Sequence, residues 1–295
     1  MSDRKKHEQE VRSYLHNHFP IQHWFFSLPP GSGMETYFVQ GRDQQYFVKV
    51  GAHVERYLVM ADAGLTPPVL ASGHLEGGSS VLVQPLIKGR NPTRADYRDQ
   101  LEKVAALVRK MHHHPRLKDV LQPVSSNRHR DAGLEALNQL RQKWERYKEQ
   151  VPITAEFVDN CLEELASQIK LFSIEGLVAS HSDICNANWL FSSDGNIYIV
   201  DFESMAMDDP AFDLGALLWW YYPPELRGQF LEIAGYPYDD DLKLRMRIRM
   251  ALHCLSITLP REGSFDSFHA DRYHEALDDF RAILEGRENP QGYYP

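Results

Sequence analysis

The chain has 295 residues, of which 43% are hydrophobic and 25% are charged, and its formal net charge is −9. This length exceeds what one hydrophobic core usually serves and predicts two subdomains. No run of eighteen apolar residues occurs and the N-terminus is polar, so we expect neither a membrane span nor a signal peptide. Three scattered cysteines are too few for a disulfide framework or a zinc site, and we expect a reducing, cytoplasmic location.

The negative charge is distributed unevenly along the chain. Residues 1–87 carry a net charge of −1, which leaves −8 of the total −9 to residues 88–295. An acidic surface repels nucleic acid and anionic membranes and attracts cationic ligands, although excess acidic residues also serve solubility. We therefore expect neither nucleic acid nor a membrane as a partner.

The first predicted elements are two strands that form a hairpin. Aromatic and β-branched residues predict strands at 37–40 and 45–50, joined by a turn at 41–43. On the second strand, Lys49 shares a face with Phe47, because strand side chains alternate. A strand lysine is most often solvent-facing.

A glycine-rich turn precedes this hairpin. It contains Gly31, Ser32 and Gly33, and backbone amides in such a turn approach phosphate oxygens without a large side chain in the way. Alone, the pattern is typical of an ordinary loop. Before a predicted hairpin, it indicates a cover for nucleotide phosphates.

Helices dominate the rest of the chain. A helix is expected within 53–65, and an apolar strand is expected to start at Ser80 and run into Gly89. From Thr93 onward helical spacing prevails, with further helices at about 134–150 and 154–172.

The helix that begins near Thr93 has recognisable ends. Thr93 and Asp96 are capping candidates, and apolar residues recur at three and four residue steps up to Met111. Three adjacent histidines follow at 112–114. Consecutive helical residues point about 100° apart, so these histidines cannot converge on one metal ion, and His112 is expected to pack in the interior.

Residues 181–188, with the sequence HSDICNAN, carry the strongest functional signal. Asp183 and Asn188 are five apart, which is the separation of the base and the metal-binding Asn in a kinase catalytic loop. Asp201 ends the apolar run 197–200, which predicts a strand that delivers a carboxylate to a loop. Two metal ligands facing a hydroxyl-activating carboxylate suit phosphoryl transfer, in which positioning and charge neutralisation are the main tasks. The alternative, a polar turn with incidental carboxylates, does not account for the complete spacing.

Three segments together resemble the aminoglycoside phosphotransferase and choline kinase superfamily: HSDICNANWLF, IYIVDFE and DDPAFDLGALL. This resemblance implies an α+β, protein-kinase-like fold with a small antiparallel-sheet lobe (1–87) and a larger helical lobe (88–295). By resemblance, Asp183 is the catalytic base, Asn188 and Asp201 hold Mg²⁺, and Asp213 braces the catalytic loop. Ser182 stands where glycine is commoner in the family.

The resemblance also assigns nucleotide contacts. Lys49 corresponds to the kinase lysine that binds the α- and β-phosphates of ATP, with GTP as the alternative nucleotide, and Glu55 is its expected ion-pair partner. The apolar strand that ends near Pro85 resembles the connector that binds adenine. The carbonyl of Pro85 and the amide of Ile87 would make these hydrogen bonds, and the missing N–H of proline is not needed. A solvated helix glutamate and an edge strand with a proline are the alternatives.

The acceptor is the least specified part of the prediction. Carboxylates and aromatic rings suit a small cationic alcohol such as choline, ethanolamine, thiamine or an aminoglycoside; the candidates are Glu203, Asp208, Asp209, Trp219 and Trp220. The alternatives are a kinase of a neutral sugar or other hydroxylated metabolite, and a catalytically silent nucleotide-binding protein. A protein kinase is disfavoured because Phe-Glu follows Asp201 and no Ala-Pro-Glu signature occurs.

Overall fold

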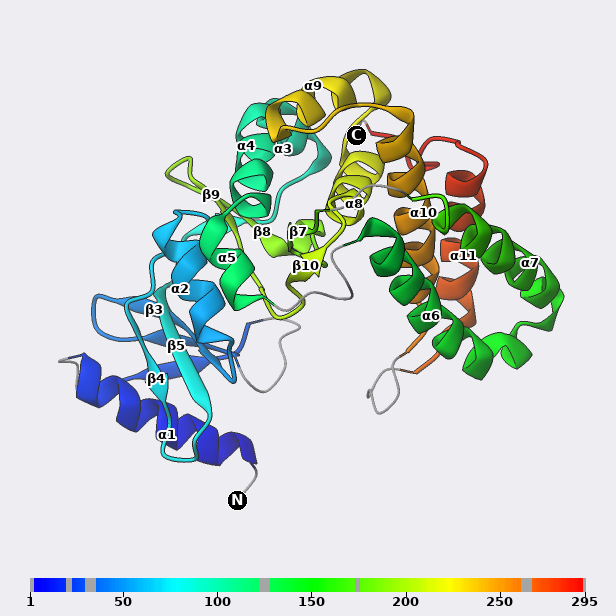
Figure 1. Ribbon diagram of the computed structural model, residues 1–295. Coiled ribbons are helices and arrows are strands. Elements are labelled where there is room, and N and C mark those ends of the chain that lie inside the picture. The colour runs from blue at the N-terminus through cyan, green and yellow to red at the C-terminus, as the bar shows by residue number, and fades with distance from the viewer. Residues whose placement is uncertain are drawn as a thin grey trace. The chain divides into compact units, whose positions relative to one another are not determined.

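The computed structural model describes residues 3–19, 23–29, 36–121, 128–172, 176–260 and 267–293 (Figure 1). The chain forms two compact units. The first comprises Met1–Asn91 with Ala187–Ser204, and the second comprises Pro92–Asn186 with Met205–Pro295. No helix within the described ranges is long and apolar enough to span a membrane. All three cysteines are free thiols.

An antiparallel sheet is the centre of the first unit. Its strand order is β1-β2-β3-β5-β4, and the strands are β1 (Phe25–Ser27), β2 (Thr36–Gln40), β3 (Gln45–Val50), β4 (Ala71–His74) and β5 (Ser80–Pro85). The predicted hairpin is confirmed, because β2 pairs with β3 and Gln40 lies opposite Gln45. The predicted strand that starts at Ser80 is confirmed as β5, but it ends at Pro85 and does not reach Gly89.

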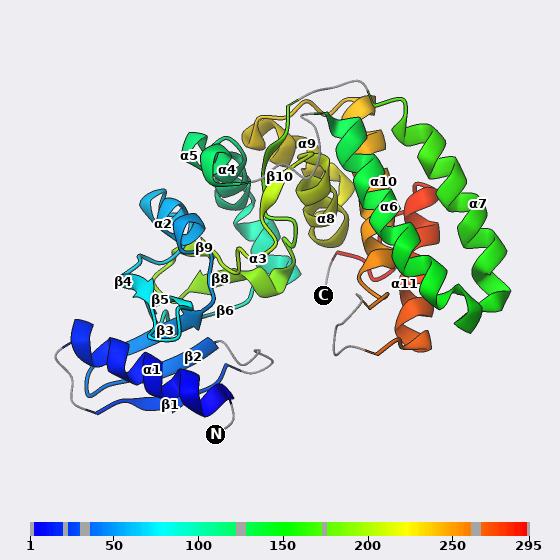
Figure 2. The same ribbon diagram turned by 60° about the horizontal axis from the view of Figure 1, so that its bottom comes forward.

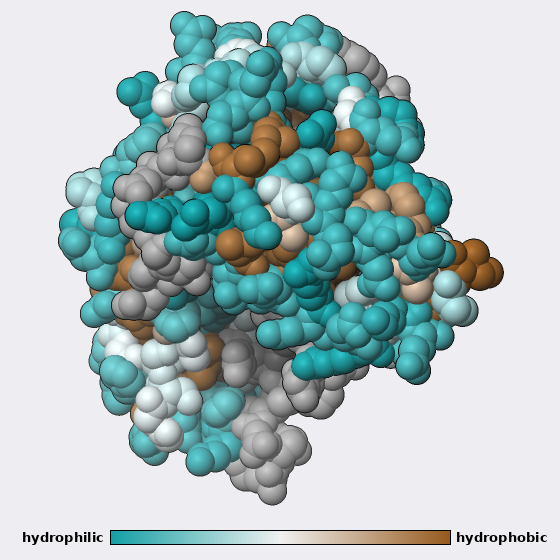
Figure 3. Space-filling view, turned by 45° about the vertical axis from the view of Figure 1, so that its right-hand side comes forward, coloured by the Kyte–Doolittle hydropathy of each residue, from teal (hydrophilic) through white to brown (hydrophobic). Residues whose placement is uncertain are grey.

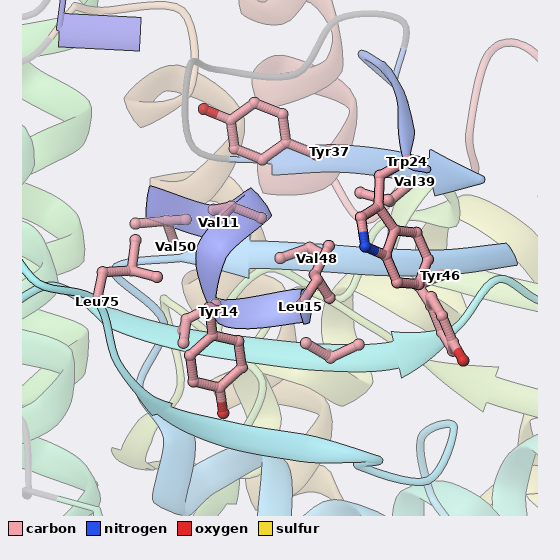
Figure 4. Packing of buried hydrophobic residues seen from close by; sticks show 12 residues of the cluster. Val11, Tyr14, Leu15, Trp24, Tyr37, Val39, Tyr46, Val48, Val50 and Leu75 are labelled. Carbon is pink, nitrogen blue, oxygen red and sulfur yellow. The ribbon is translucent and has the colours of Figure 1, made fainter. Parts of the chain in front are cut away.

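Helix α1 (Asp3–His18) covers one face of this sheet (Figures 2 and 4). Val11, Tyr14 and Leu15 pack in one hydrophobic cluster with strand residues that include Tyr37 and Val48. Sequence periodicity does not predict this helix, because it is polar along most of its length and presents few apolar side chains to the sheet. Sheet packing therefore stabilises a helix whose own pattern is weak.

Helix α2 (Val54–Asp62) lies on the other side of the sheet (Figure 2). The alternation of β3 places Val48 in the α1 cluster and turns Lys49 to the opposite face. There the Lys49 ammonium lies 3.3 Å from the hydroxyl of Tyr57 on α2. The strand alternation therefore delivers Lys49 to the α2 face.

A second, three-stranded sheet completes the first unit. Its order is β6-β8-β9, and the strands are β6 (Gly89–Arg90), β8 (Trp189–Ser192) and β9 (Ile197–Ile199). The predicted strand before Asp201 is confirmed as β9. A β-carbon on Gly89 would come 2.7 Å from the carbonyl oxygen of Phe191, so this pairing requires glycine.

The second unit is mainly helical. Its helices are α3 (Arg94–Asp99), α4 (Leu101–His112), α5 (Pro115–Val120), α6 (His129–Tyr147), α7 (Pro152–Ile169), α8 (Ala211–Tyr221), α9 (Pro224–Ala234), α10 (Asp240–Ser256) and α11 (Ala270–Leu284). Strands β7 (Val178–Ser180) and β10 (Ala206–Asp208) form a short antiparallel pair. Helix α10 is central, since it packs against α6, α8 and α11.

The predicted helices of this unit are present with altered ends. Thr93 and Asp96, the predicted capping residues, form a capping box at the start of α3. The helix expected to continue to Met111 is divided at Gln100 into α3 and α4. The helices expected at about 134–150 and 154–172 are confirmed as α6 and α7.

Candidate active site

The loop that contains Asp183 is held by a buried carboxylate. Asp213, on the first turn of α8, accepts hydrogen bonds from the backbone N–H groups of His181 (2.8 Å) and Ser182 (3.1 Å). Its other contact is with Nε2 of His112, at 3.0 Å. Burial raises the pKa of Asp213, but the hydrogen bonds and charges of the two histidines outweigh burial and hold that pKa below its usual range. Asp213 is therefore an ionised brace, and His112 packs in the interior as expected.

Ser182 has a backbone conformation that explains why glycine is commoner at this position. Its φ is 62°, in the left-handed region that strains residues with a β-carbon. Asp213 accepts its N–H, and its hydroxyl lies 3.2 Å from the hydroxyl of Ser180. The brace therefore holds the loop in a conformation that a serine adopts only at a cost.

Asp183 lines a pocket of about 250 Å³ within the second unit. Most of the wall is apolar or aromatic, and the lining residues are Ser182, Asp183, Ile184, Cys185, Phe212, Asp213, Ala216, Trp220, Tyr221, His253 and Ile257. Tyr97 stacks on Tyr221 with ring centroids 4.4 Å apart, and the Tyr221 hydroxyl accepts the backbone N–H of Asn186 at 2.9 Å. A largely apolar pocket with a carboxylate in its wall is the usual form of a small-molecule site.

His253 enters this pocket from α10, and no sequence motif identifies it. Its ring meets the Phe212 ring edge to face, with centroids 5.2 Å apart. Burial lowers the pKa of His253 to about 4, although the carboxylates of Asp183 and Asp213 oppose this decrease. The imidazole is therefore neutral near pH 7.

Two of the carboxylates that were predicted to contact the phosphate acceptor form ion pairs with arginines. Asp208 is buried and lies 2.6 Å from Nη2 of Arg249, and Asp209 is buried and pairs with Arg245. Asp209 also accepts the backbone N–H of Ala211 at the start of α8. These ion pairs neutralise both carboxylates inside the protein, so the structure gives Asp208 and Asp209 a structural role in place of the expected contact with a cationic acceptor.

The predicted tryptophans line two different pockets. Trp220 lines the Asp183 pocket. Trp219 lines a separate pocket of about 140 Å³, and its indole N–H donates to the carbonyl of Arg287 at 3.4 Å. Their rings are nearly perpendicular, at 84°, because consecutive helical residues diverge.

In the first unit, Lys49 is the centre of a charged cluster. Its ammonium lies 2.8 Å from Asp201 and 2.9 Å from Glu203. Burial lowers the pKa of Lys49, but Tyr57 and the two carboxylates outweigh burial and raise it. The lysine is therefore cationic throughout the physiological range.

The predicted Lys49–Glu55 ion pair is not formed. Glu55 is exposed and makes no ion pair with any described residue, whereas Tyr57, two residues further along α2, faces Lys49. Asp201 and Glu203, which follow β9, are the ion-pair partners of Lys49 instead of Glu55. The sequence correctly placed Lys49 on the same face of the strand as Phe47. Which side chain of α2 faces Lys49 depends on the rotation of the helix about its axis, which the sequence does not give.

Asn188 and Asp201 are brought close by strand pairing. Asn188 precedes β8 and accepts the backbone N–H of Val200 through its carbonyl at 2.9 Å. Asp201 has a φ of 65°, and its carboxylate is 52% exposed although it contacts Lys49. Arg56 donates to the backbone carbonyls of Phe202 and Glu203, at 2.9 and 3.0 Å, which fixes the segment that follows.

This donor set fits a magnesium ion. Carboxylate and amide oxygens are the ligands Mg²⁺ takes, and Mg²⁺ is usually held by one or two carboxylates together with substrate phosphates. The described residues contain no group of three or more His, Cys, Asp or Glu side chains placed to enclose a metal. A site that depends on phosphate oxygens needs no such group.

Five further residues were predicted to bind the nucleotide. Gly31, Ser32 and Gly33 lie outside the described residues. Pro85 ends β5, where it lies opposite Tyr46 of β3. Ile87 follows the strand and is partly buried.

Comparison with known proteins identifies the family. A phosphotransferase enzyme family matches residues 27–247. The chain belongs to this family. It is therefore a small-molecule phosphotransferase, and its α+β fold is of the protein-kinase-like type.

Solved structures of similar fold belong to kinases with different acceptors. Choline kinase LicA from Streptococcus pneumoniae has a TM-score of 0.67 and 16% identity, with 94% of this chain and 99% of that chain covered. A choline/ethanolamine kinase family protein from Mesorhizobium loti has a TM-score of 0.67 and 17% identity over 96% of both chains. Spectinomycin phosphotransferase APH(9)-Ia, in complex with ADP and spectinomycin, has a TM-score of 0.61 and 15% identity over 94% of this chain and 93% of that chain. At these identities the likeness concerns the fold.

Proposed function

We propose that the protein transfers the γ-phosphate of ATP to a hydroxyl of a small cationic molecule. The observation that carries this proposal is the pocket beside Asp183, whose loop is fixed by the buried Asp213. A fixed carboxylate in the wall of a small pocket suits the orientation and deprotonation of an acceptor hydroxyl. Family membership supplies the reaction class, phosphoryl transfer to a small molecule.

Asp183 is the proposed catalytic base. It accepts the proton of the acceptor hydroxyl as the oxygen attacks the phosphorus, and the bond from phosphorus to the leaving oxygen of the nucleotide breaks. Lys49 would bind the α- and β-phosphates, and Asp201 and Asn188 would hold Mg²⁺. When bound, Mg²⁺ neutralises the negative charge on the phosphates.

ATP is the proposed nucleotide, with GTP as the alternative. The cationic Lys49 and its cluster support binding of a polyphosphate, and the relative bound to spectinomycin also contains ADP. The turn with Gly31, Ser32 and Gly33 is proposed to cover the phosphates. The backbone of Pro85 and Ile87 is proposed to bind the base, with 1–87 as the nucleotide lobe and 88–295 as the acceptor lobe.

The acceptor is proposed to be small. A cavity of about 150 Å³ accommodates benzene, so a pocket of about 250 Å³ suits a group on the order of ten non-hydrogen atoms. Trp220 and Tyr221 line this pocket, and aromatic rings attract cations through their faces. A small amino alcohol, or one ring of a larger antibiotic, satisfies both conditions. A neutral sugar remains the second candidate acceptor.

The test is a panel of hydroxylated amines, sugars and aminoglycosides, assayed for release of nucleoside diphosphate with ATP and with GTP. Asp183→Ala should lower kcat by about 10²–10⁴ and leave nucleotide binding nearly unchanged, because the base contacts the acceptor. Asp43→Ala, in the exposed β2–β3 turn, is the matched control and should retain full activity. Retention of more than half the turnover in Asp183→Ala would remove Asp183 as the base.

A further inference from the structure

His253 is the histidine of the Asp183 pocket, and its ring nitrogens have no hydrogen-bond partner among the described residues. Its described contact is the edge-to-face packing with Phe212. Other polar groups of the pocket wall are already engaged: the Tyr221 hydroxyl accepts the N–H of Asn186, and Asp213 accepts two backbone N–H groups. His253 therefore differs from these neighbours, because its hydrogen-bonding capacity is unused.

His253 is partly buried, and its ring faces the pocket. A ligand that fills the pocket removes the ring nitrogens from solvent, and a nitrogen that is then left without a partner weakens binding, whereas a ligand that supplies the partner avoids this loss. Because burial lowers the pKa of His253 to about 4, the ring at neutral pH carries one N–H donor and one nitrogen that accepts. The accepting nitrogen needs an N–H or O–H group on the ligand.

The charges around the pocket favour a cationic donor. Among the described lining residues there are two carboxylates, Asp183 and Asp213, and no lysine or arginine. Two cations act on His253 from outside the lining: Arg249, which lies over the Phe212 ring at 4.9 Å and is paired with Asp208, and Lys143 of α6, whose ammonium donates to the carbonyl and the hydroxyl of Ser256. An ammonium group therefore meets aromatic rings and negative charge in the pocket, and its N–H groups match the free nitrogen of His253.

We propose that His253 accepts a hydrogen bond from a primary or secondary ammonium group of the acceptor, so that the enzyme selects amino alcohols that retain an N–H group. This inference rests on the proposed function and specifies its acceptor class. A quaternary ammonium alcohol has the same charge but no N–H donor, and it leaves His253 unpaired in the pocket. Selection against it follows from the rule that a site built for a hydrogen bond rejects the analogue that lacks it.

The decisive experiment compares matched pairs of acceptors that differ in N-methylation. 2-Aminoethanol and choline form one pair, and each amine that the panel identifies forms another with its N-trimethyl derivative. In the wild type, N-trimethylation should lower kcat/KM by a factor of about 10–100, the range for one hydrogen bond to a charged group. A neutral diol of similar size should be poorer than the amine. Equal or better use of the quaternary or neutral analogue overturns the proposal.

Two substitutions of His253 isolate the role of the ring nitrogen. His253→Phe keeps a ring but cannot accept a hydrogen bond, and it should reduce the preference for the N–H form to less than about threefold. His253→Gln retains an accepting oxygen and should keep a clear preference. His274→Phe, at an exposed position on α11, makes the same change away from the pocket and should alter neither value. An unchanged preference in His253→Phe overturns the proposal.

Folding and function are checked separately. Nucleotide binding without acceptor and thermal unfolding show whether His253→Phe is folded, and His253→Gln carries the test if it is not. Should no compound of the panel be phosphorylated, the proposed function fails, and calorimetric binding of 2-aminoethanol against choline still tests the pocket. Tighter binding of 2-aminoethanol supports the role of His253, whereas equal binding, or binding of neither, overturns it.

Discussion

At the scale of single residues, two positions at the proposed site have a strained backbone. Ser182, before Asp183, and Asp201, after β9, both have φ values in the left-handed region, at 62° and 65°. Within the described ranges they are the non-glycine residues with positive φ. Such conformations persist where surrounding contacts determine them, and they gather at functional sites. For Ser182 the determining contact is Asp213.

The backbone strain at Ser182 predicts that glycine is more stable than alanine at this position, which is the reverse of their order in a helix. Ser182→Gly should be more stable than Ser182→Ala by about 1 kcal/mol, because glycine adopts this φ without a β-carbon clash. At an exposed helical serine such as Ser167 the order should be reversed by a similar amount. Urea unfolding of the four variants measures both differences. Greater stability of Ser182→Ala would show that the backbone there is not strained.

The two proposed magnesium ligands should contribute unequally to nucleotide binding. Asp201→Asn should weaken Mg²⁺-dependent ATP binding more than Asn188→Ala does, because a carboxylate supplies charge as well as a ligand atom. Asp201→Asn also removes one partner of Lys49, whereas Glu203 remains. Calorimetry with and without Mg²⁺ separates the two effects. Equal losses that do not depend on the metal would assign both residues a structural role.

At the scale of elements, a buried ion pair joins β10 to α10. Asp208 ends β10 and Arg249 lies on α10, with 2.6 Å between the carboxylate and Nη2. Burial raises the pKa of Asp208, and Arg249 limits that increase. Breaking a buried pair leaves an uncompensated charge, which is far more costly than the loss of an exposed pair.

Arg249→Met should therefore lower the free energy of unfolding by about 3–5 kcal/mol. Without the arginine, the pKa of Asp208 rises further above its unfolded value. A raised carboxyl pKa stabilises the fold at low pH and loses that contribution as pH rises, so the deficit should be greater at pH 7.5 than at pH 5.

Controls for this variant use the same substitution elsewhere. Arg141→Met breaks the exposed pair of Arg141 with Glu163 and should cost less than about 1 kcal/mol. The double variant Asp208→Leu/Arg249→Met removes both charges and should recover most of the loss. A deficit that does not change with pH would mean that lost packing of the arginine stem, not the unpaired carboxylate, dominates.

The accuracy of sequence prediction differed between local and long-range features. The β2–β3 hairpin, the strand before Asp201, the capping box and the helices α6 and α7 follow from local periodicity. The partners of buried charges do not, since Asp208 and Arg249 are 41 residues apart. Helix α1 is set by packing on a sheet, and His253 becomes a pocket residue only when α10 meets the Asp183 loop. Ion-pair partners and pocket walls are tertiary features that local spacing does not encode.

At the scale of the whole molecule, the net negative charge of the chain does not measure the negative charge that is available to a cationic acceptor. The chain has a formal net charge of −9, and Figure 3 shows a face covered mostly by hydrophilic residues. Asp208 and Asp209 contribute no attraction of their own to a cationic acceptor, because arginines neutralise them. Any attraction of cations to the second unit must therefore come from its remaining acidic surface and from the carboxylates of the Asp183 pocket.

The last prediction concerns this attraction. If the acceptor is cationic, its KM should rise with ionic strength, because salt near physiological concentration screens charges beyond about 8–10 Å. The measurement is initial rate against acceptor concentration at several salt concentrations, with nucleotide and Mg²⁺ saturating so that their own salt dependence does not enter. Neutral sugars of similar size should compete poorly at every salt concentration. Efficient phosphorylation of a neutral sugar without salt dependence would discard the cationic acceptor and leave the assignment to the phosphotransferase family intact, because that assignment rests on residues 27–247 and not on the charge of the pocket.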